Sequence, residues 1–159
     1  MMQMSVKENT SLSTLARTQL CGFVRGKQER RAVESVQART RIKAASPDAT
    51  VSTLSGGNQQ KALIARWLLV DPPILFLDDP TRGVDIGAKI DIYKIIRELS
   101  AKGKGVIFVS SELPELLQCC HRILVLHDGH SMGILESGDA TQERIMELAT
   151  RTVEQGIDR

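Results

Sequence analysis

Aromatic side chains are scarce in this sequence of 159 residues, which has three phenylalanines, one tyrosine and one tryptophan. The acidic and basic residues nearly balance, and the formal net charge is +2. A charge this small gives no general reason to expect nucleic acid or an anionic membrane as the partner. The length and a hydrophobic content of 42% fit one sizeable core.

Charge is nevertheless uneven along the chain. The stretch from Arg25 to Lys43 holds seven basic and two acidic residues, a local net charge of +5. We interpret it as the solvated face of a helix, and the alternative is a contact with an acidic partner or nucleic acid. The stretch contains no aromatic residue that could stack on bases.

Cysteines are also few: Cys21, Cys119 and Cys120 are an odd number, and the last two are adjacent. This pattern makes a poor disulfide framework and indicates a reduced, cytosolic setting. His121 follows the cysteine pair, but no second pair of ligands stands at zinc-finger spacing, so no metal site is expected from these side chains alone.

Long apolar runs are missing as well. No stretch approaches the roughly 18 to 20 residues that span a bilayer, and residues 1–5 lack the basic segment and apolar core of a signal peptide. We therefore expect the chain itself to be soluble, and any connection to a membrane to run through a partner.

Residues 1 to about 50 are polar and contain no strand-like run. Ser5 and Glu8 have the spacing of a capping box and predict a short helix, and residues 28–45 predict a second, weakly amphipathic one. A loop that begins at Ser46-Pro47 then leads to Ser55, which we expect to cap a helix through about Val70.

From Asp71 onward strands and helices alternate. Short apolar runs predict three buried strands, the first of the type covered on both faces: residues 74–77, 106–109 and 123–126. Helices are expected from Asp85, from Glu112 and from the Asp139–Gln142 cap through Leu148, and Asp128-Gly129 predicts a turn into a small antiparallel hairpin. The two crossovers favour an α/β fold with a mostly parallel sheet.

Two motifs carry chemistry. Ser55-Gly56-Gly57 offers a hydroxyl and approachable N–H groups at the positive end of a helix, which suits a phosphate oxygen, although the same residues are common in plain turns. Asp78 and Asp79 follow a buried strand, so the first can bind magnesium and the second can accept a proton from water. Such a pair also occurs as helix caps or turn residues.

In combination these motifs resemble the later part of an ATP-binding cassette (ABC) ATPase, and most closely the second nucleotide-binding domain of bacterial sugar importers of the ribose/galactose type. Residues 54–61, Leu-Ser-Gly-Gly-Asn-Gln-Gln-Lys, resemble the signature motif of that family. Residues 74–78 resemble its Walker B strand, residues 81–85 its D-loop and residues 109–112 its switch region. The similarity extends from about Ser5 to Leu148.

The resemblance implies a partial P-loop NTPase (RecA-like) core with an N-terminal helical subdomain. It divides the chain into a helical signature subdomain (1–69), a core with the Walker B, D-loop and switch segments (70–137) and a C-terminal helix and tail (138–159). The implied cofactors are ATP and Mg2+, with Asp78 holding the metal and Asp79 and Ser111 in catalytic positions. The residues implied to bind nucleotide, across a dimer of cassettes, are Ser55, Gly56, Gly57, Asn58, Gln59 and Asp85.

Three departures from the family pattern bear on activity. Asp79 stands where the family usually has a glutamate, and it is shorter by one methylene, so we expect reduced hydrolysis. Ser111 stands where many members have a histidine and carries no positive charge. The sequence contains no phosphate-binding loop G-x-x-x-x-G-K-[ST]. Residues 22–28 look similar, but they have one residue too few between the glycines and end in glutamine instead of serine or threonine. The chain therefore looks like a fragment, a truncated gene product or a split-off part.

The function implied is that of an ATPase subunit that energises carbohydrate import, cytoplasmic and peripheral at the inner face of the plasma membrane. Its partners would be a second cassette, transmembrane permease subunits and, indirectly, a periplasmic sugar-binding protein, and no nucleic acid is expected. One alternative is a non-catalytic module that donates Ser55-Gly56-Gly57 to the ATP site of a partner, or a decayed fragment. The other is a nucleic-acid-associated cassette ATPase, which only the stretch from Arg25 to Lys43 supports.

Overall fold

The computed structural model describes residues 1–15, 19–20, 23–24 and 26–151. These residues divide into two compact units between residues 107 and 108, inside strand β4 (Gly105–Val109). The functional segmentation expected from the sequence, at residues 69 and 137, stays a prediction.

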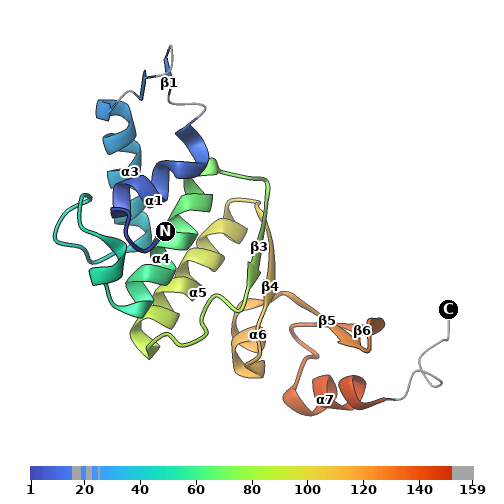
Figure 1. The fold of residues 1–159 in the computed structure, drawn as a ribbon. Helices are drawn as coiled ribbons and strands as arrows, with labels where there is room; N and C mark the ends of the chain where they lie inside the picture. The colour runs from blue at the N-terminus through green and yellow to red at the C-terminus, as the bar shows by residue number, and fades with distance from the viewer. Residues whose placement is uncertain (16–18, 21–22, 25, 152–159) are drawn as a thin grey trace. The chain divides into compact units, whose positions relative to one another are not determined.

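Helices dominate the first unit. They are α1 (Val6–Ser11), α3 (Gly26–Thr40), α4 (Gly56–Val70) and α5 (Ile86–Ala101), with short 3-10 turns η1 (Leu12–Thr14) and η2 (Val51–Thr53). Helix α4 lies between the others and packs against α1, α3 and α5 (Figure 1). Its buried face carries Ile64, Ala65 and Leu68, which meet a core that also holds Val33 and Ile92. Fully burying one such aliphatic side chain stabilises a fold by about 1.5 to 3 kcal/mol.

The capping box predicted at the start of α1 is confirmed. The Glu8 N–H donates to Ser5 Oγ over 3.1 Å, and the Ser5 N–H donates to Glu8 Oε2 over 2.8 Å. These bonds from the Ser5 backbone and hydroxyl hold the pKa of the Glu8 carboxyl below its usual value. A local sequence signature thus sets this helix boundary.

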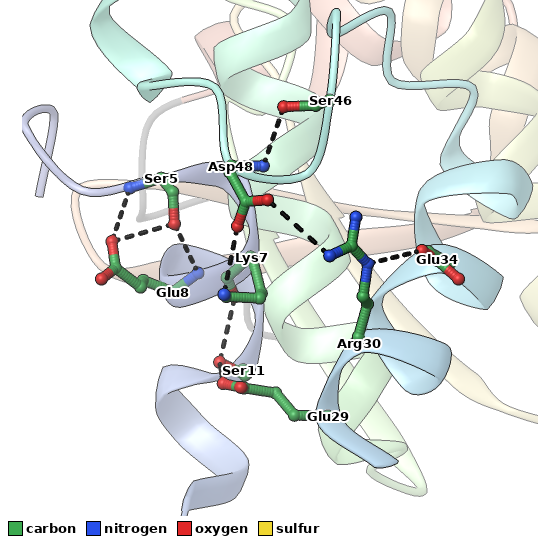
Figure 2. Close-up of polar contacts among 9 residues, drawn as sticks. All are labelled: Ser5, Lys7, Glu8, Ser11, Glu29, Arg30, Glu34, Ser46 and Asp48. Carbon is green, nitrogen blue, oxygen red and sulfur yellow. Dashed lines mark hydrogen bonds and ion pairs between the residues drawn. The ribbon is translucent and has the colours of Figure 1, made fainter. Parts of the chain in front are cut away.

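A network of partly exposed charges joins α1, α3 and the loop before η2 (Figure 2). Asp48 pairs with Lys7 at 3.1 Å and with Arg30 at 3.9 Å, and Arg30 also pairs with Glu34 at 3.1 Å. Exposed pairs of this kind contribute little stability each. They do show that Arg30, in the basic stretch, lies on a solvated helix face with acidic neighbours, as the first interpretation of that stretch requires.

Two details of the first 50 residues differ from expectation. The prediction of no strands is wrong, because β1 (Gln19–Leu20) pairs antiparallel with β2 (Phe23–Val24). Strands of two residues are too short to show the alternating pattern by which a sequence reveals a strand. The helix expected over 28–45 ends at Thr40, because Arg41 adopts a left-handed φ of 53°. Cys21, Gly22 and Arg25 lie outside the described residues.

Strand β3 (Ile74–Asp78) and strand β4 form a parallel pair. The Gly105 N–H donates to the Pro73 carbonyl at 3.0 Å where the pair begins. Leu75 is buried, whereas Phe76 is 61% exposed, so the expectation that the first strand is covered on both faces is wrong. In β4, expected to be buried, Ile107 is 51% exposed. An apolar run predicts a strand that can be covered, but not which residues cover it.

The second unit contains α6 (Leu113–Cys119), β5 (Arg122–His127), β6 (His130–Glu136) and α7 (Gln142–Thr150). Strand β5 pairs antiparallel with β6 through a turn in which Asp128 and Gly129 both have positive φ, which confirms the predicted hairpin. Helix α7 starts where predicted, with Thr141 Oγ1 accepting from the Arg144 N–H. The core of this unit consists of Ile123, Val125, Leu135 and Ile145.

Within the described part of the chain, no helix is both long and apolar enough to cross a bilayer.

Candidate functional site

The site begins at the N-terminus of α4. Ser55 is the N-cap residue, with extended backbone angles, but its side chain accepts no hydrogen bond from the helix backbone. The Ser55 carbonyl accepts the first helical bond, from the Gln59 N–H at 2.9 Å. The first backbone N–H groups of a helix have no acceptor within it. Ser55 and Gly56 are both exposed, so this end of the helix dipole is open to an anion.

The two glycines after Ser55 have different surroundings. A β-carbon on Gly56 would have its nearest neighbour, the Gly83 carbonyl oxygen, at 3.8 Å, an ordinary contact. Gly57 is buried, and a β-carbon there would overlap that of Ala88. Only Gly56 is therefore open to a ligand from outside. At position 57 a side chain has no room, because α5 packs against the backbone there.

Asp85 lies beside this turn. Its Oδ1 accepts from the Ala88 N–H at 3.0 Å and caps α5, as predicted. Its Oδ2 would lie 3.2 Å from a β-carbon on Gly57. The structure therefore brings two motifs of the sequence together, the signature turn and the segment 81–85, in one chain.

The side chains of Asn58 and Gln59 are engaged within the chain. Asn58 Oδ1 accepts from the Lys43 N–H at 2.9 Å, and Asn58 Nδ2 donates to Ser55 Oγ at 2.9 Å. Gln59 Nε2 donates to the Leu54 carbonyl at 2.9 Å. Both residues hold the backbone or hydroxyl groups around the helix start, and their binding to nucleotide stays a prediction.

A buried ion pair behind the site was missed by sequence reasoning. Lys61, whose side chain is 3% exposed, donates to the Arg41 carbonyl at 2.8 Å and to Asp91 Oδ2 at 3.1 Å. Arg41 also reaches Asp91 Oδ1, at 3.4 Å. The available signal was the position of Lys61 on the same helix face as the buried Gly57 and Ile64, where a charge needs a partner.

The carboxylates at the end of β3 differ in their surroundings. Asp78 is exposed, and its carboxylate has no hydrogen bond or ion pair with the residues that the structure describes. Asp79 is half-buried and has a left-handed φ of 42°, and its carbonyl accepts from the Arg82 N–H at 3.1 Å. Asp is one of the few residues that tolerate this conformation, so Asp79 is a turn residue whatever its chemistry.

The remaining candidate, Ser111, lies in the second unit, in the exposed loop before α6. Its neighbour Ser110 accepts from the Glu112 N–H at 3.0 Å and donates to the buried Glu115 at 2.7 Å. These bonds define the shape of the loop. Ser111 and the two aspartates belong to different units of the structure.

Two large apolar residues of α4 are exposed. Trp67 is 48% exposed, and Leu63, one turn earlier, is 46% exposed. The helix packs against α1, α3 and α5, and its buried residues include Ile64, Ala65 and Leu68.

An α/β chain with an open, glycine-containing helix start and an exposed carboxylate, Asp78, at the end of a parallel strand has the features of a nucleotide-binding ATPase domain. Residues 1–82 match the model of the family described as ABC transporter. The chain belongs to this family. The match includes the signature residues and Asp78 and Asp79, while Asp85 and Ser111 lie beyond it.

Relatives agree with the family. The "Putative ribose/galactose/methyl galactoside import ATP-binding protein" of Pseudomonas savastanoi pv. phaseolicola is 49% identical over 147 residues, which are 92% of this chain and 28% of that protein. The ribose import ATP-binding protein RbsA of Geobacillus kaustophilus is 48% identical over 149 residues, 94% of this chain and 30% of that protein. The chain thus spans less than a third of the length of these relatives.

Solved structures show the same fold. The dimeric post-hydrolysis state of the ATP-binding cassette MJ0796 bound to ADP and Pi aligns with a TM-score of 0.74 at 25% identity, covering 86% of this chain and 58% of that one. The ADP conformation of the cassette MJ1267 aligns with a TM-score of 0.69 at 22% identity, covering 96% and 62%. The chain therefore has an ABC ATPase fold. ABC ATPase domains bind nucleotide.

Proposed function

We propose that this chain is the signature and Walker B portion of an ATPase that energises carbohydrate import. In this role the α4 N-terminus binds the terminal phosphate of an ATP held by a second cassette. The observation that carries the proposal is the state of Ser55: the residue caps α4 through its backbone, while its exposed hydroxyl is not used for capping. A hydroxyl and open N–H groups at one helix end form a phosphate-binding arrangement.

The proposed partners follow from the family and the relatives. The names of the relatives give ribose and galactose as imported sugars, and MJ0796 is a dimer of cassettes. A second cassette, membrane permeases and a position at the inner face of the membrane are therefore proposed for this chain too. Which sugar is carried does not follow from the residues at the site.

Magnesium is proposed to bind at Asp78. An exposed carboxylate without a partner among the residues that the structure describes is a suitable ligand, because Mg2+ in phosphate sites is held by one or two carboxylates together with substrate oxygens and water. When bound, the ion would neutralise charge on the phosphates. Asp79, next along the chain, is proposed to accept the proton of the attacking water.

The 159 residues contain no G-x-x-x-x-G-K-[ST] loop. That loop supplies most of the contacts that position the phosphates, and positioning dominates phosphoryl transfer. The chemistry open to these residues by themselves is therefore the donation of a signature in trans. For these 159 residues taken by themselves, the second candidate is a module that supplies Ser55, Gly56 and Gly57 to a partner without hydrolysing ATP itself.

An acceptor cassette would test signature donation directly. We define it as an intact cassette of the ribose-import type that carries the phosphate-binding loop but has alanine in place of its own signature serine. Its ATP turnover is measured as the chain is added. Turnover should rise with the concentration of the chain and fall back when the chain carries Ser55→Ala. If the chain causes no rise, donation in trans is refuted.

Measuring the chain alone with ATP and Mg2+ separates the two candidates. A module without its own hydrolysis stimulates the acceptor cassette but shows no turnover alone. Salt-sensitive binding to nucleic acid that weakens when Arg30 and Arg31 are reversed would instead support the nucleic-acid-associated alternative. The pairing of Arg30 with Glu34 and Asp48 speaks against that outcome.

A further inference from the structure

The side-chain amide of Asn58 joins two groups: the exposed hydroxyl of Ser55 and the backbone N–H of Lys43, in the segment that follows α3. Its Oδ1 lies 2.9 Å from the Lys43 nitrogen, and its Nδ2 lies 2.9 Å from Ser55 Oγ. Asn58 is the third residue of α4, one turn after Ser55. Ser55 is exposed, and Asn58 is partly covered.

The identity of these groups determines which way each bond runs. A backbone N–H can only donate, so the Asn58 atom facing Lys43 must be the carbonyl oxygen. The amide nitrogen then faces Ser55 and donates to its oxygen. Because Ser55 Oγ accepts this bond, its own proton points away from Asn58. That proton remains available to a phosphate oxygen on the exposed side.

The segment that donates to Asn58 has a second attachment to α4. Lys43 follows the left-handed residue Arg41, whose carbonyl accepts from the buried Lys61 at 2.8 Å. Lys61 lies one turn after Asn58 on α4 and pairs with Asp91 of α5. The segment 41–43 is thus attached to α4 at two points, once at Lys61 and once at Asn58.

We infer that Asn58 is a positioning residue, which orients the Ser55 hydroxyl as a donor toward the terminal phosphate of an ATP held by a partner cassette. The inference rests on the proposed function and gives Asn58 a role other than direct contact with nucleotide. Asparagine suits the position because its amide offers both an acceptor for Lys43 and a donor for Ser55. Aspartate has the same shape but offers only acceptors, so it would turn the Ser55 proton inward.

The test uses the full chain and the acceptor cassette, with ATP turnover as the readout. The variants are Ser55→Ala, Asn58→Ala and the double variant, and kcat and the KM for ATP are measured for each. Asn58→Ala should lower kcat/KM by about three- to tenfold, the usual worth of one hydrogen bond. In the Ser55→Ala background, Asn58→Ala should not lower kcat/KM further, because the effects of two substitutions are not additive when the two residues act together.

Two further variants separate orientation from structure. Asn58→Asp keeps the shape and the bond to Lys43, so a merely structural role predicts a milder loss than with Asn58→Ala. Proton orientation predicts the reverse order, with the loss from Asn58→Asp the larger of the two. Lys43→Ala is the matched control, because it removes an exposed side chain but keeps the backbone donor, and turnover should not change.

Each outcome decides the question. A loss with Ser55→Ala, together with a non-additive loss with Asn58→Ala, supports the inference. A loss with Ser55→Ala but none with Asn58→Ala, or fully additive losses, overturns the inference and leaves the proposed function standing. If Ser55→Ala itself changes nothing, the proposed function fails and the inference fails with it.

Discussion

Gly57 lies against Ala88 so closely that a methyl group on Gly57 would overlap the methyl group of Ala88. This contact joins the start of α4 to the first turn of α5, next to the cap residue Asp85. The glycine pair of the signature therefore has two separate reasons to lack side chains. Gly56 leaves an approach open to a ligand, and Gly57 permits two helices to meet.

Gly57→Ala should accordingly destabilise the fold. An extra methyl group in a packed contact costs about 1 to 3 kcal/mol, and this one would also lie 3.2 Å from Asp85 Oδ2 and 3.4 Å from Val84 Cγ1. The measurement is the free energy of unfolding in urea. Gly56→Ala is the matched control, because its new methyl group meets only an ordinary contact, and its stability should change by less than about 0.5 kcal/mol.

Gly56→Ala, which should barely change the stability, should nevertheless change the activity. Gly56→Ala should reduce stimulation of the acceptor cassette without unfolding the chain, because the methyl group narrows the exposed approach to the helix N-terminus. Equal loss of stability in the two variants would contradict the packing role of Gly57.

The helix starts were predictable because their determinants are local. Ser5, Ser55, Asp85 and Thr141 all stand at the N-cap positions that the sequence indicates. The coverage of the strands was not predictable, because exposure at Phe76 depends on residues far along the chain or on another chain. A pattern within one strand carries no information on that point.

The ion pair between the buried Lys61 and the partly exposed Asp91 leads to a second prediction. Asp91→Ala leaves the Lys61 ammonium, 3% exposed, without an anion, and should destabilise the fold by about 3 kcal/mol. Lys61→Met should cost less, about 1 kcal/mol for the lost bond to the Arg41 carbonyl, because the partly exposed Asp91 keeps Arg41 as a partner.

Combining the two changes tests the electrostatic explanation. Lys61→Met in the Asp91→Ala background removes the unpaired cation and should restore part of the lost stability. The comparison is a double-mutant cycle measured by urea unfolding. Additive losses would show that the charges do not depend on each other.

The candidate site was only partly predictable for a related reason. Ser55, Gly56 and the two aspartates follow from motifs of adjacent residues, whereas the bonds of Asn58 and Lys61 reach Lys43 and Asp91, which are 15 and 30 positions away. Such pairings depend on how α3, α4 and α5 pack. One sequence shows that a buried lysine needs a partner, but not which residue provides it.

A third prediction concerns pH. Hydrogen bonds from the Ser5 backbone and hydroxyl lower the pKa of Glu8 in the folded chain. A lowered pKa means that the carboxylate stabilises the fold above the pKa of the unfolded chain, which is about 4.3 for a glutamate. This stabilisation disappears as the pH falls through the lower pKa of the folded chain.

The free energy of unfolding of the chain and of Glu8→Gln should therefore differ at neutral pH and converge as the pH falls below about 4. Glutamine can still accept the Ser5 N–H bond but has no charge to lose, so the change isolates the titration. Parallel curves over this range would show that the capping box does not depend on ionisation. The measurement is urea unfolding at a series of pH values.

The last prediction concerns Asp79, whose left-handed φ of 42° makes it a turn residue and whose position after β3 makes it the proposed base. The two roles predict different results for two substitutions. Asparagine tolerates the left-handed conformation as well as aspartate does, but it cannot accept a proton. Glutamate can accept a proton over a longer reach, but it tolerates that conformation less well.

A chimera provides the measurement, with this chain replacing the matched segment of the 48%-identical RbsA of Geobacillus kaustophilus, so that the chain is tested within a relative of full length. If Asp79 is the base, Asp79→Asn lowers ATP turnover by about 10²- to 10⁴-fold with little change in stability. Asp79→Glu then raises turnover above that of the unchanged chimera while lowering stability by about 1 kcal/mol for the strained backbone. If Asp79 serves the turn alone, Asp79→Asn leaves turnover unchanged and Asp79→Glu lowers it together with the stability. The ratio of the two turnover rates therefore decides between the roles, because the stability of the chimera falls with glutamate in either case.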